Sequence, residues 1–263
     1  MLKNILLKSL RDYRWATLWW SLGVALTIAL LVAIYPDYSK AGEELNALLD
    51  NPAMKAFIGE MTDLTTPEGF FTMEGFNMFF PILIIIFSVM IGTNFVSGDE
   101  KEGTLELLIS TPLNRYSIIA QKAAALSILT IFLGSVFLVS IVLGVIAIDI
   151  DISLLNITIM CLHLILLGLI FGNLSFFIGS ATGNKGYSVG ITCALALIGY
   201  LINAFSSMST ILDAMKYLSP FYYYIAPNPL FYGFNLLHMI ILALVVLMLN
   251  FLSLVLFNRR NLT

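Results

Sequence analysis

The sequence predicts an all-α polytopic membrane protein with six transmembrane helices, and two observations support this fold class. The first is composition: of 263 residues, 59% are hydrophobic and 11% are charged, and the mean hydropathy is +0.95. A soluble domain has roughly 25% charged residues, so a soluble fold is excluded. The second is a series of six apolar runs, each long enough to supply the about 20 residues that a spanning helix needs.

The six runs define the expected spans of a single transmembrane domain that covers residues 1–263. The third and fourth are longer than a bilayer requires, so we expect them to tilt or to extend beyond it. The fifth is the shortest. In chain order the runs are residues 16–35, 76–96, 120–148, 154–180, 187–206 and 236–257.

The positions of lysine and arginine predict that both termini are cytoplasmic. With the N-terminus inside, ten of the 13 basic residues fall on the inner side. This agrees with the positive-inside rule, and an even number of spans then places the C-terminus inside as well. The inner residues are Lys3, Lys8, Arg11, Arg14, Lys101, Arg115, Lys122, Lys185, Arg259 and Arg260; the outer ones are Lys40, Lys55 and Lys216.

Two segments flank the first span. Residues 1–15 have an amphipathic pattern with four basic residues, which predicts either a helix lying in the inner membrane interface or a basic flank that only fixes topology. Residues 36–75 are expected to form an extracellular loop that is too long for a simple connector. Its apolar spacing predicts two short amphipathic helices, whose acidic faces we interpret as solvated surface in preference to a cation site.

The segment over residues 207–235 is expected to be extracellular and re-entrant or interfacial. Its three prolines, Pro220, Pro227 and Pro229, exclude one continuous span. Helical spacing of the apolar residues before them predicts a short helix; these are Met208, Ile211, Leu212 and Met215.

The same segment is rich in aromatic residues, and two interpretations remain open. One is a belt at the membrane–water boundary, where tyrosine is favoured. The other is an outer gate that lines an exit path. The candidate gate residues are Leu218, Pro220, Phe221, Tyr222 and Tyr223.

Chemistry that would mark other membrane functions is missing from the sequence. No span has a clear charge at its centre, as proton and ion carriers usually require. There is no Walker motif, no nucleophile or metal constellation for catalysis, and no basic tract for nucleic acid. His163 and His238 are interpreted as packed polar residues. Three small-xxx-small pairs predict close helix approach; they are 168–172, 179–183 and 186–190.

A charged island over residues 98–115, GDEKEGTLELLISTPLNR, separates the second and third spans. After Thr104 the leucines follow a helix-like pattern, which Pro112 ends. A well-patterned polar segment held at a membrane face is typical of a docking element for another protein.

This island resembles the signature of type-2 ABC exporter permeases, in which an acidic–basic stretch precedes Gly-Thr-Leu-Glu-Leu-Leu-Leu-Ser-Thr-Pro between spans two and three. Six spans, both termini inside, a long first outer loop and the Leu-Ser-Pro-Phe segment at 218–221 also match that family. The resemblance covers nearly the whole chain and implies the type-2 ABC exporter permease fold, in a multi-pass protein of a plasma or inner membrane, with a prokaryotic source expected.

In that family the island is a coupling helix, here residues 97–116, which rests in a cleft of a separate ATPase subunit. The carboxylates can pair with basic residues of the partner, while Gly103 permits a tight entry and Thr104 can cap the helix. The contact residues implied by the resemblance are Glu100, Glu102, Gly103, Thr104, Glu106, Thr111, Pro112 and Arg115.

The resemblance also implies the partners and the activity. Two copies of the ATPase would bind ATP and Mg²⁺, and the chain itself would bind no cofactor. A second permease, identical or similar, would pair with this chain in the lipid membrane and complete the transport path. We expect export of hydrophobic or amphipathic cargo such as peptides, antibiotics, drugs or lipids. Three alternatives are a sensor or regulatory subunit with the same docking helix, a secondary carrier, and an intramembrane enzyme. A carrier predicts internal repeats with broken helices, and the two halves show no convincing repeat.

Overall fold

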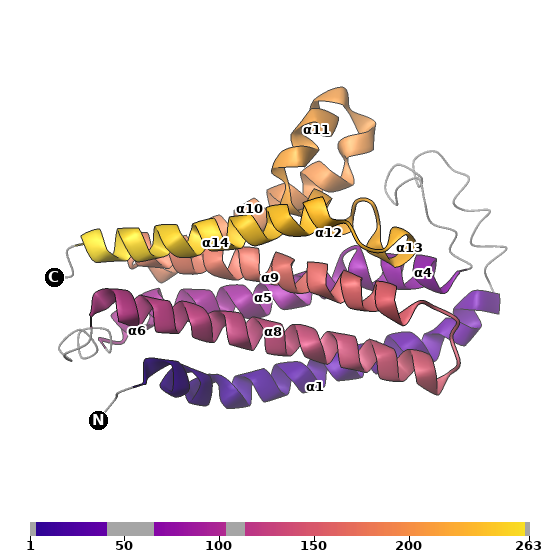
Figure 1. Cartoon of the computed structure of the whole chain (residues 1–263), viewed down its shortest axis with the longest axis horizontal. Coiled ribbons are helices and arrows are strands. Elements are labelled where there is room, and N and C mark those ends of the chain that lie inside the picture. Colours follow the sequence, from indigo (N-terminus) through magenta and orange to yellow (C-terminus); the bar gives the residue numbers. More distant parts are fainter. Residues whose placement is uncertain (1–3, 41–65, 104–113, 261–263) are drawn as a thin grey trace.

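Six long helices lie side by side in one bundle in the computed structural model, which describes residues 4–40, 66–103 and 114–260 (Figure 1). Each of the six is long and apolar enough to cross a membrane, so the predicted number of spans is confirmed. The start of the first span and the end of the last span lie at one end of the bundle, which we call the proximal end, and the opposite end is the distal end.

The spans are built from α1 (Ile5–Lys40), a composite second span, α8 (Arg115–Ala147), α9 (Leu154–Thr182), α10 (Lys185–Ala204) and α14 (Leu236–Arg259). The second span consists of α4 (Pro67–Phe70), η1 (Phe71–Phe76), α5 (Phe79–Thr93), η2 (Asn94–Gly98) and α6 (Asp99–Lys101). Between α10 and α14 lie η3 (Ser206–Met208), α11 (Thr210–Met215), η4 (Lys216–Leu218), α12 (Pro220–Ile225) and α13 (Pro229–Tyr232).

Side-chain caps explain where four of the long helices begin. The side-chain oxygens of the residues before α8, α9, α10 and α14 each accept a hydrogen bond from the first turn, at 2.8 to 3.3 Å. Such caps satisfy backbone N–H groups that have no partner within the helix. The capping residues are Asn114, Ser153, Asn184 and Asn235.

The second span begins earlier than the sequence predicts. It starts at Pro67 and not near residue 76, because Phe70, Phe71 and Phe76 are buried in the bundle core. The six residues of η1 and the five of η2 form π-helical turns, which a search for a 3.6-residue period does not register. The predicted outer loop over 36–75 is therefore shorter at its C-terminal side; its predicted amphipathic helices fall mainly on residues 41–65, outside the described residues.

Helices α5 and α9 form the centre of the bundle, with α8, α10 and α14 packed against α9. Glycines allow the close crossing: a Cβ at Gly172 would lie 2.9 Å from the Cβ of Ser88, and one at Gly168 would lie 2.9 Å from Cγ1 of Ile84. The close approach predicted for the pair 168–172 is confirmed. A Cβ added at Gly190 would have no atom within 4 Å, so the pair 186–190 does not serve this purpose within the described part of the chain.

Helix α1 packs along α8 and runs without a break from Ile5 to Lys40. Residues 5–15 thus run directly into the first span, and their position in the inner membrane interface stays a prediction. At the start of α1, Oε1 of Gln121 on α8 accepts hydrogen bonds from the backbone N–H groups of Ile5 at 2.9 Å and Leu6 at 3.2 Å. This contact fixes the start of α1 to the neighbouring span.

Replacing Gln121 with leucine is expected to lower the free energy of unfolding by about 1–2 kcal/mol, because two helix N-terminal N–H groups lose their acceptor. Gln121→Glu keeps an acceptor and adds a negative charge that a helix N-terminus favours, so it should retain wild-type stability. Thermal melting of the purified proteins in detergent would measure the stability of both variants against the wild type. Equal losses in the two variants would contradict the capping role.

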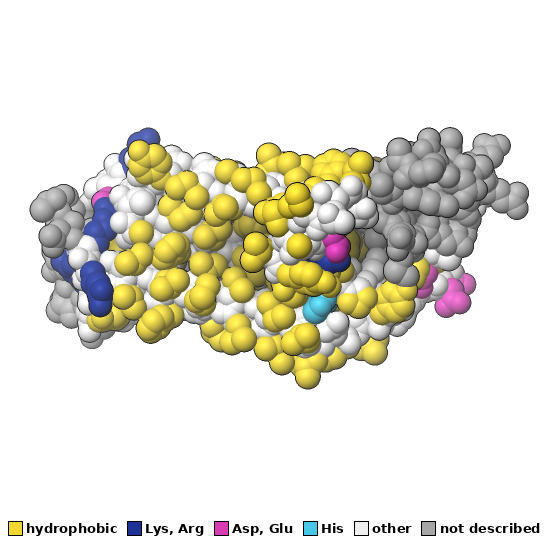
Figure 2. Space-filling view, turned by 90° about the horizontal axis from the view of Figure 1, so that it is seen from above, with side chains coloured by type: hydrophobic (Ala, Val, Ile, Leu, Met, Phe, Trp, Pro, Cys, Tyr) yellow, Lys and Arg dark blue, Asp and Glu magenta, His cyan; other side chains and the backbone are white. Residues whose placement is uncertain are grey.

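The short helix predicted before the prolines is present as α11 and stands out sideways from the bundle (Figure 1). Met208, Ile211 and Leu218 on this projection are exposed. Figure 2 shows hydrophobic side chains over the middle of one face of the molecule, with Lys and Arg gathered towards the proximal end. This distribution is the one expected of a surface in contact with lipid.

Candidate functional site

The charged island leaves the second span at the proximal end (Figure 1). The π-helical turn η2 leads from α5 into the single turn of α6, and the described chain resumes at Asn114 before α8. Of the predicted contact residues, Glu100, Glu102, Gly103 and Arg115 are described. Thr104, Glu106, Thr111 and Pro112 lie outside the described residues.

Lys122 on α8 forms the deepest charged contact at this end. The lysine is 1% exposed, and its Nζ donates hydrogen bonds to Oδ2 of Asp99 and to the backbone oxygen of Phe95. A buried ammonium group is costly unless it is paired, so this contact holds α6 and η2 firmly against α8. The sequence offered one signal of this role: Lys122 is a basic residue inside an otherwise apolar run.

Glu100, which follows Asp99 in the chain, forms an ion pair with Arg260 at the end of α14. The pair sits against the turn between α9 and α10, where a Cβ at Gly183 would lie 2.6 Å from Oε1 of Glu100. Gly183 has a φ of +66°, a conformation that glycine adopts at no steric cost. Arg115 completes the group by donating from Nη1 to the backbone oxygen of Arg260 at 3.3 Å.

These contacts bring together residues that are distant in the sequence. We call the group the proximal clamp; its members are Asp99, Glu100, Arg115, Lys122 and Arg260. Arg260 was predicted only as a basic residue that fixes topology, and its pairing with Glu100 spans 160 positions. No local pattern signals a contact of that range.

Beyond the clamp, the three described residues that follow Glu100 face outward. Lys101, Glu102 and Gly103 are exposed. Gly103 has a φ of +70°, which suits the tight entry that the sequence analysis assigned to it. Its backbone N–H bonds to the oxygen of Glu100 at 3.1 Å and closes the turn after α6. An acidic side chain is thus presented at the proximal end on a backbone that the clamp holds in place.

The candidate gate residues lie at the distal side, on and next to α12. Phe221 is 4% exposed and packs on the rings of Phe171 and Tyr200, whereas Leu218 is 79% exposed. Pro220 begins α12, after Ser219, whose hydroxyl donates to the backbone oxygen of Gly199 at 2.7 Å.

Tyr222 and Tyr223 are partly buried and form a cluster of three rings with His238, whose ring centroid lies 5.5 and 5.1 Å from theirs. Burial raises the pKa of Tyr222 above its ordinary value. The five residues thus comprise a buried anchor, an exposed leucine, the proline that begins α12 and two tyrosines in an aromatic cluster. Gating by this segment stays a prediction.

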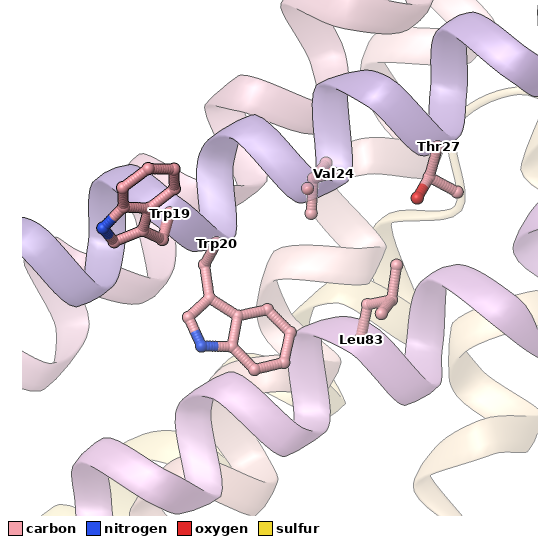
Figure 3. Close-up of a pocket in the computed structure, with 6 residues that line it drawn as sticks. Trp19, Trp20, Val24, Thr27 and Leu83 are labelled. Carbon is pink, nitrogen blue, oxygen red and sulfur yellow. The ribbon is translucent and has the colours of Figure 1, made fainter.

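An apolar groove that the sequence analysis did not foresee opens between α1 and α5 (Figure 3). It has a volume of about 240 Å³. The ring of Trp20 lies edge-on to Phe87 on α5, with centroids 5.8 Å apart. The groove is lined by Trp19, Trp20, Gly23, Val24, Thr27 and Leu83.

Comparison with known proteins bears on this arrangement. A family model described as "ABC-2 family transporter protein" matches residues 3–262, nearly the whole chain. None of the curated proteins compared with the chain matched it.

Proposed function

The chain belongs to the ABC-2 transporter family, and we propose that it is the permease subunit of an ATP-driven exporter whose ATPase is a separate subunit. Family membership makes the chain a membrane component that lacks an ATPase domain and implies association with an ABC ATPase. The partner would bind ATP and Mg²⁺.

The proposed orientation places the proximal end in the cytoplasm. The described residues Lys101, Arg115, Lys122, Lys185 and Arg260 all belong to this end, at the starts and ends of spans. Lysine and arginine are retained on the cytoplasmic side of membrane proteins. The exposed part of the island would then face the compartment where ATP is available.

One observation carries the proposal: the acidic island between the second and third spans is presented at the same end as the start of the first span and the end of the last, on a backbone fixed by ion pairs. A segment that only needed to be soluble would not require such anchoring. A segment that is moved by a partner does require anchoring, because motion is transmitted to the spans through packed side chains and ion pairs. Closure of two ATPases on ATP would reorient the spans that the island joins.

Cargo and stoichiometry are the finer parts of the proposal. The centre of the single bundle is filled by α5 and α9, so a path for cargo would form between two copies of the chain, or between this chain and a similar one. The apolar groove on α1 and α5 supports cargo that is hydrophobic or amphipathic, because it would reach such a surface through the lipid.

The test is co-purification of an ATPase with the tagged permease from its native host. Replacing both Glu102 and Glu106 with lysine should leave membrane insertion intact and abolish recovery of the ATPase, because reversed charges would repel the basic residues that the carboxylates pair with. Asp12→Lys is the matched control, since Asp12 is an exposed acidic residue near the same end of the bundle but outside the island.

Recovery of an ATPase with the wild type and the control, and its loss in the double variant, would support the assembly. A folded wild-type permease that recovers no ATPase would overturn the proposal. Undiminished recovery with the double variant would show that the island does not dock the partner.

A further inference from the structure

We infer that Arg260 and Lys122 are positioning residues that set the orientation of the coupling segment, and that Glu100 and Arg115 act on the ATPase through them and not by direct contact. This inference rests on the proposed function. It differs from the family resemblance, which implies that Glu100 and Arg115 touch the ATPase themselves.

The three residues of α6 form the last turn of the second span, which continues from α5 through the π-helical turn η2. The last turn of a helix frays readily, because its final C=O groups have no partner within the helix. Its position therefore depends on what its side chains bind. Asp99 binds Lys122 on α8, and Glu100 binds Arg260 at the end of α14.

Consecutive side chains on a helix point about 100° apart. Because Asp99 and Glu100 are consecutive and bind two different spans, the turn of α6 is held from two sides. Loss of either pair would release one of these sides. The two pairs together define which face of the segment is turned outward, and on that face lie the exposed residues Lys101 and Glu102.

The two ion pairs differ in burial, and this difference suits them to different roles. Lys122 is almost completely enclosed, so its pair is a fixed anchor. The side chains of Glu100 and Arg260 are 31% and 18% exposed, so this pair can be exchanged without emptying the core. It also rests on Gly183, at the turn that joins α9 to α10. Movement of α6 would thus reach α8 through one pair, and α9, α10 and α14 through the other.

The charges of Glu100 and Arg115 are already directed at their own chain. Oε1 of Glu100 accepts from the guanidinium of Arg260, and Arg115 donates to the backbone of the same residue. A carboxylate engaged in this way is a poor docking point for a second positive charge, whereas Glu102 is exposed and suited to that purpose.

Charge exchange distinguishes positioning from direct contact. The experiment measures ATPase recovered per folded permease for Glu100→Arg, Arg260→Glu and the double exchange Glu100→Arg/Arg260→Glu. Each single variant places like charges together and should reduce recovery by about tenfold or more. The double exchange rebuilds the pair with the charges reversed and should restore recovery to within about threefold of the wild type. Arg260→Lys keeps the charge and should retain most of the recovery.

Arg259→Glu is the control, since Arg259 is exposed, precedes Arg260 and undergoes the same change of charge. It should leave recovery unchanged. Melting temperatures of all variants report whether the fold is retained, and recovery is compared only on monodisperse protein.

Direct contact predicts another pattern: Arg260→Glu would have no effect, and the double exchange would be as poor as Glu100→Arg alone. That result would overturn the inference while leaving the proposed function intact. If the wild type recovered no ATPase, the proposed function would fail. The pairing of Glu100 with Arg260 would then be tested by the melting temperatures alone. If the melting temperature of the double exchange fell by the sum of the two single losses, the inference would be overturned as well.

Discussion

Alanine at Gly92 is expected to destabilise the bundle strongly. A Cβ at this position would collide with the backbone oxygen of Gly172 and with Oγ of Ser175 on α9. Neither the helix backbone nor Ser175 can move aside freely, because Ser175 itself donates a hydrogen bond to the oxygen of Gly172 at 2.8 Å. Overpacking of this kind costs about 3 kcal/mol, a large part of the stability of a protein.

The same change at Gly190 provides the control. Gly190 also lies within an apolar span, but a Cβ there meets no atom within 4 Å. Alanine should be tolerated at that position, since it favours helix by about 1 kcal/mol relative to glycine. The fraction of monodisperse protein after detergent extraction would compare the two. Similar yields of Gly92→Ala and Gly190→Ala would show that α5 and α9 do not cross as closely as the structure places them.

Removing Asp99 should be more damaging than removing its partner. Asp99→Asn leaves the ammonium of Lys122 buried without a carboxylate, which is expected to cost about 3 kcal/mol. Lys122→Met leaves a carboxylate whose side chain is 31% exposed and therefore partly hydrated, so the loss should be smaller. The double variant Asp99→Asn/Lys122→Met has no charge to bury and should be more stable than Asp99→Asn alone.

Thermal melting of the four proteins would complete this cycle. The informative quantity is the difference between the double variant and the sum of the two single ones. If the effects simply added, Asp99 and Lys122 would be independent, and the anchor assigned to α8 would have to lie elsewhere.

Much of the fold could be predicted from the sequence, because lipid imposes simple rules. A bilayer requires long apolar helices, so the runs over 120–148, 154–180 and 236–257 end within a few residues of α8, α9 and α14. The position of the island between the second and third spans followed from its charges alone. Glycine spacing correctly indicated a close helix approach at 168–172, and the structure shows that the second span is among the helices approached there.

The parts that could not be predicted depend on contacts between distant residues. The start of α1 is decided by Gln121, more than a hundred positions away. The second span contains two π-helical segments, and no spacing rule reveals them. Glu100 in the island forms an ion pair with Arg260, at the far end of the sequence. Sequence reasoning therefore located the island, but it did not reveal the contacts that Glu100 and Arg115 make with Arg260.

The groove between α1 and α5 has an optical consequence. All three tryptophans of the protein, Trp15, Trp19 and Trp20, lie on α1, and two of them line the groove. The tryptophan fluorescence of the whole protein therefore reports on one helix. Quenching of this emission by lipids brominated at chosen depths along the acyl chain would read the occupancy of the groove in an unmodified permease, with no attached dye.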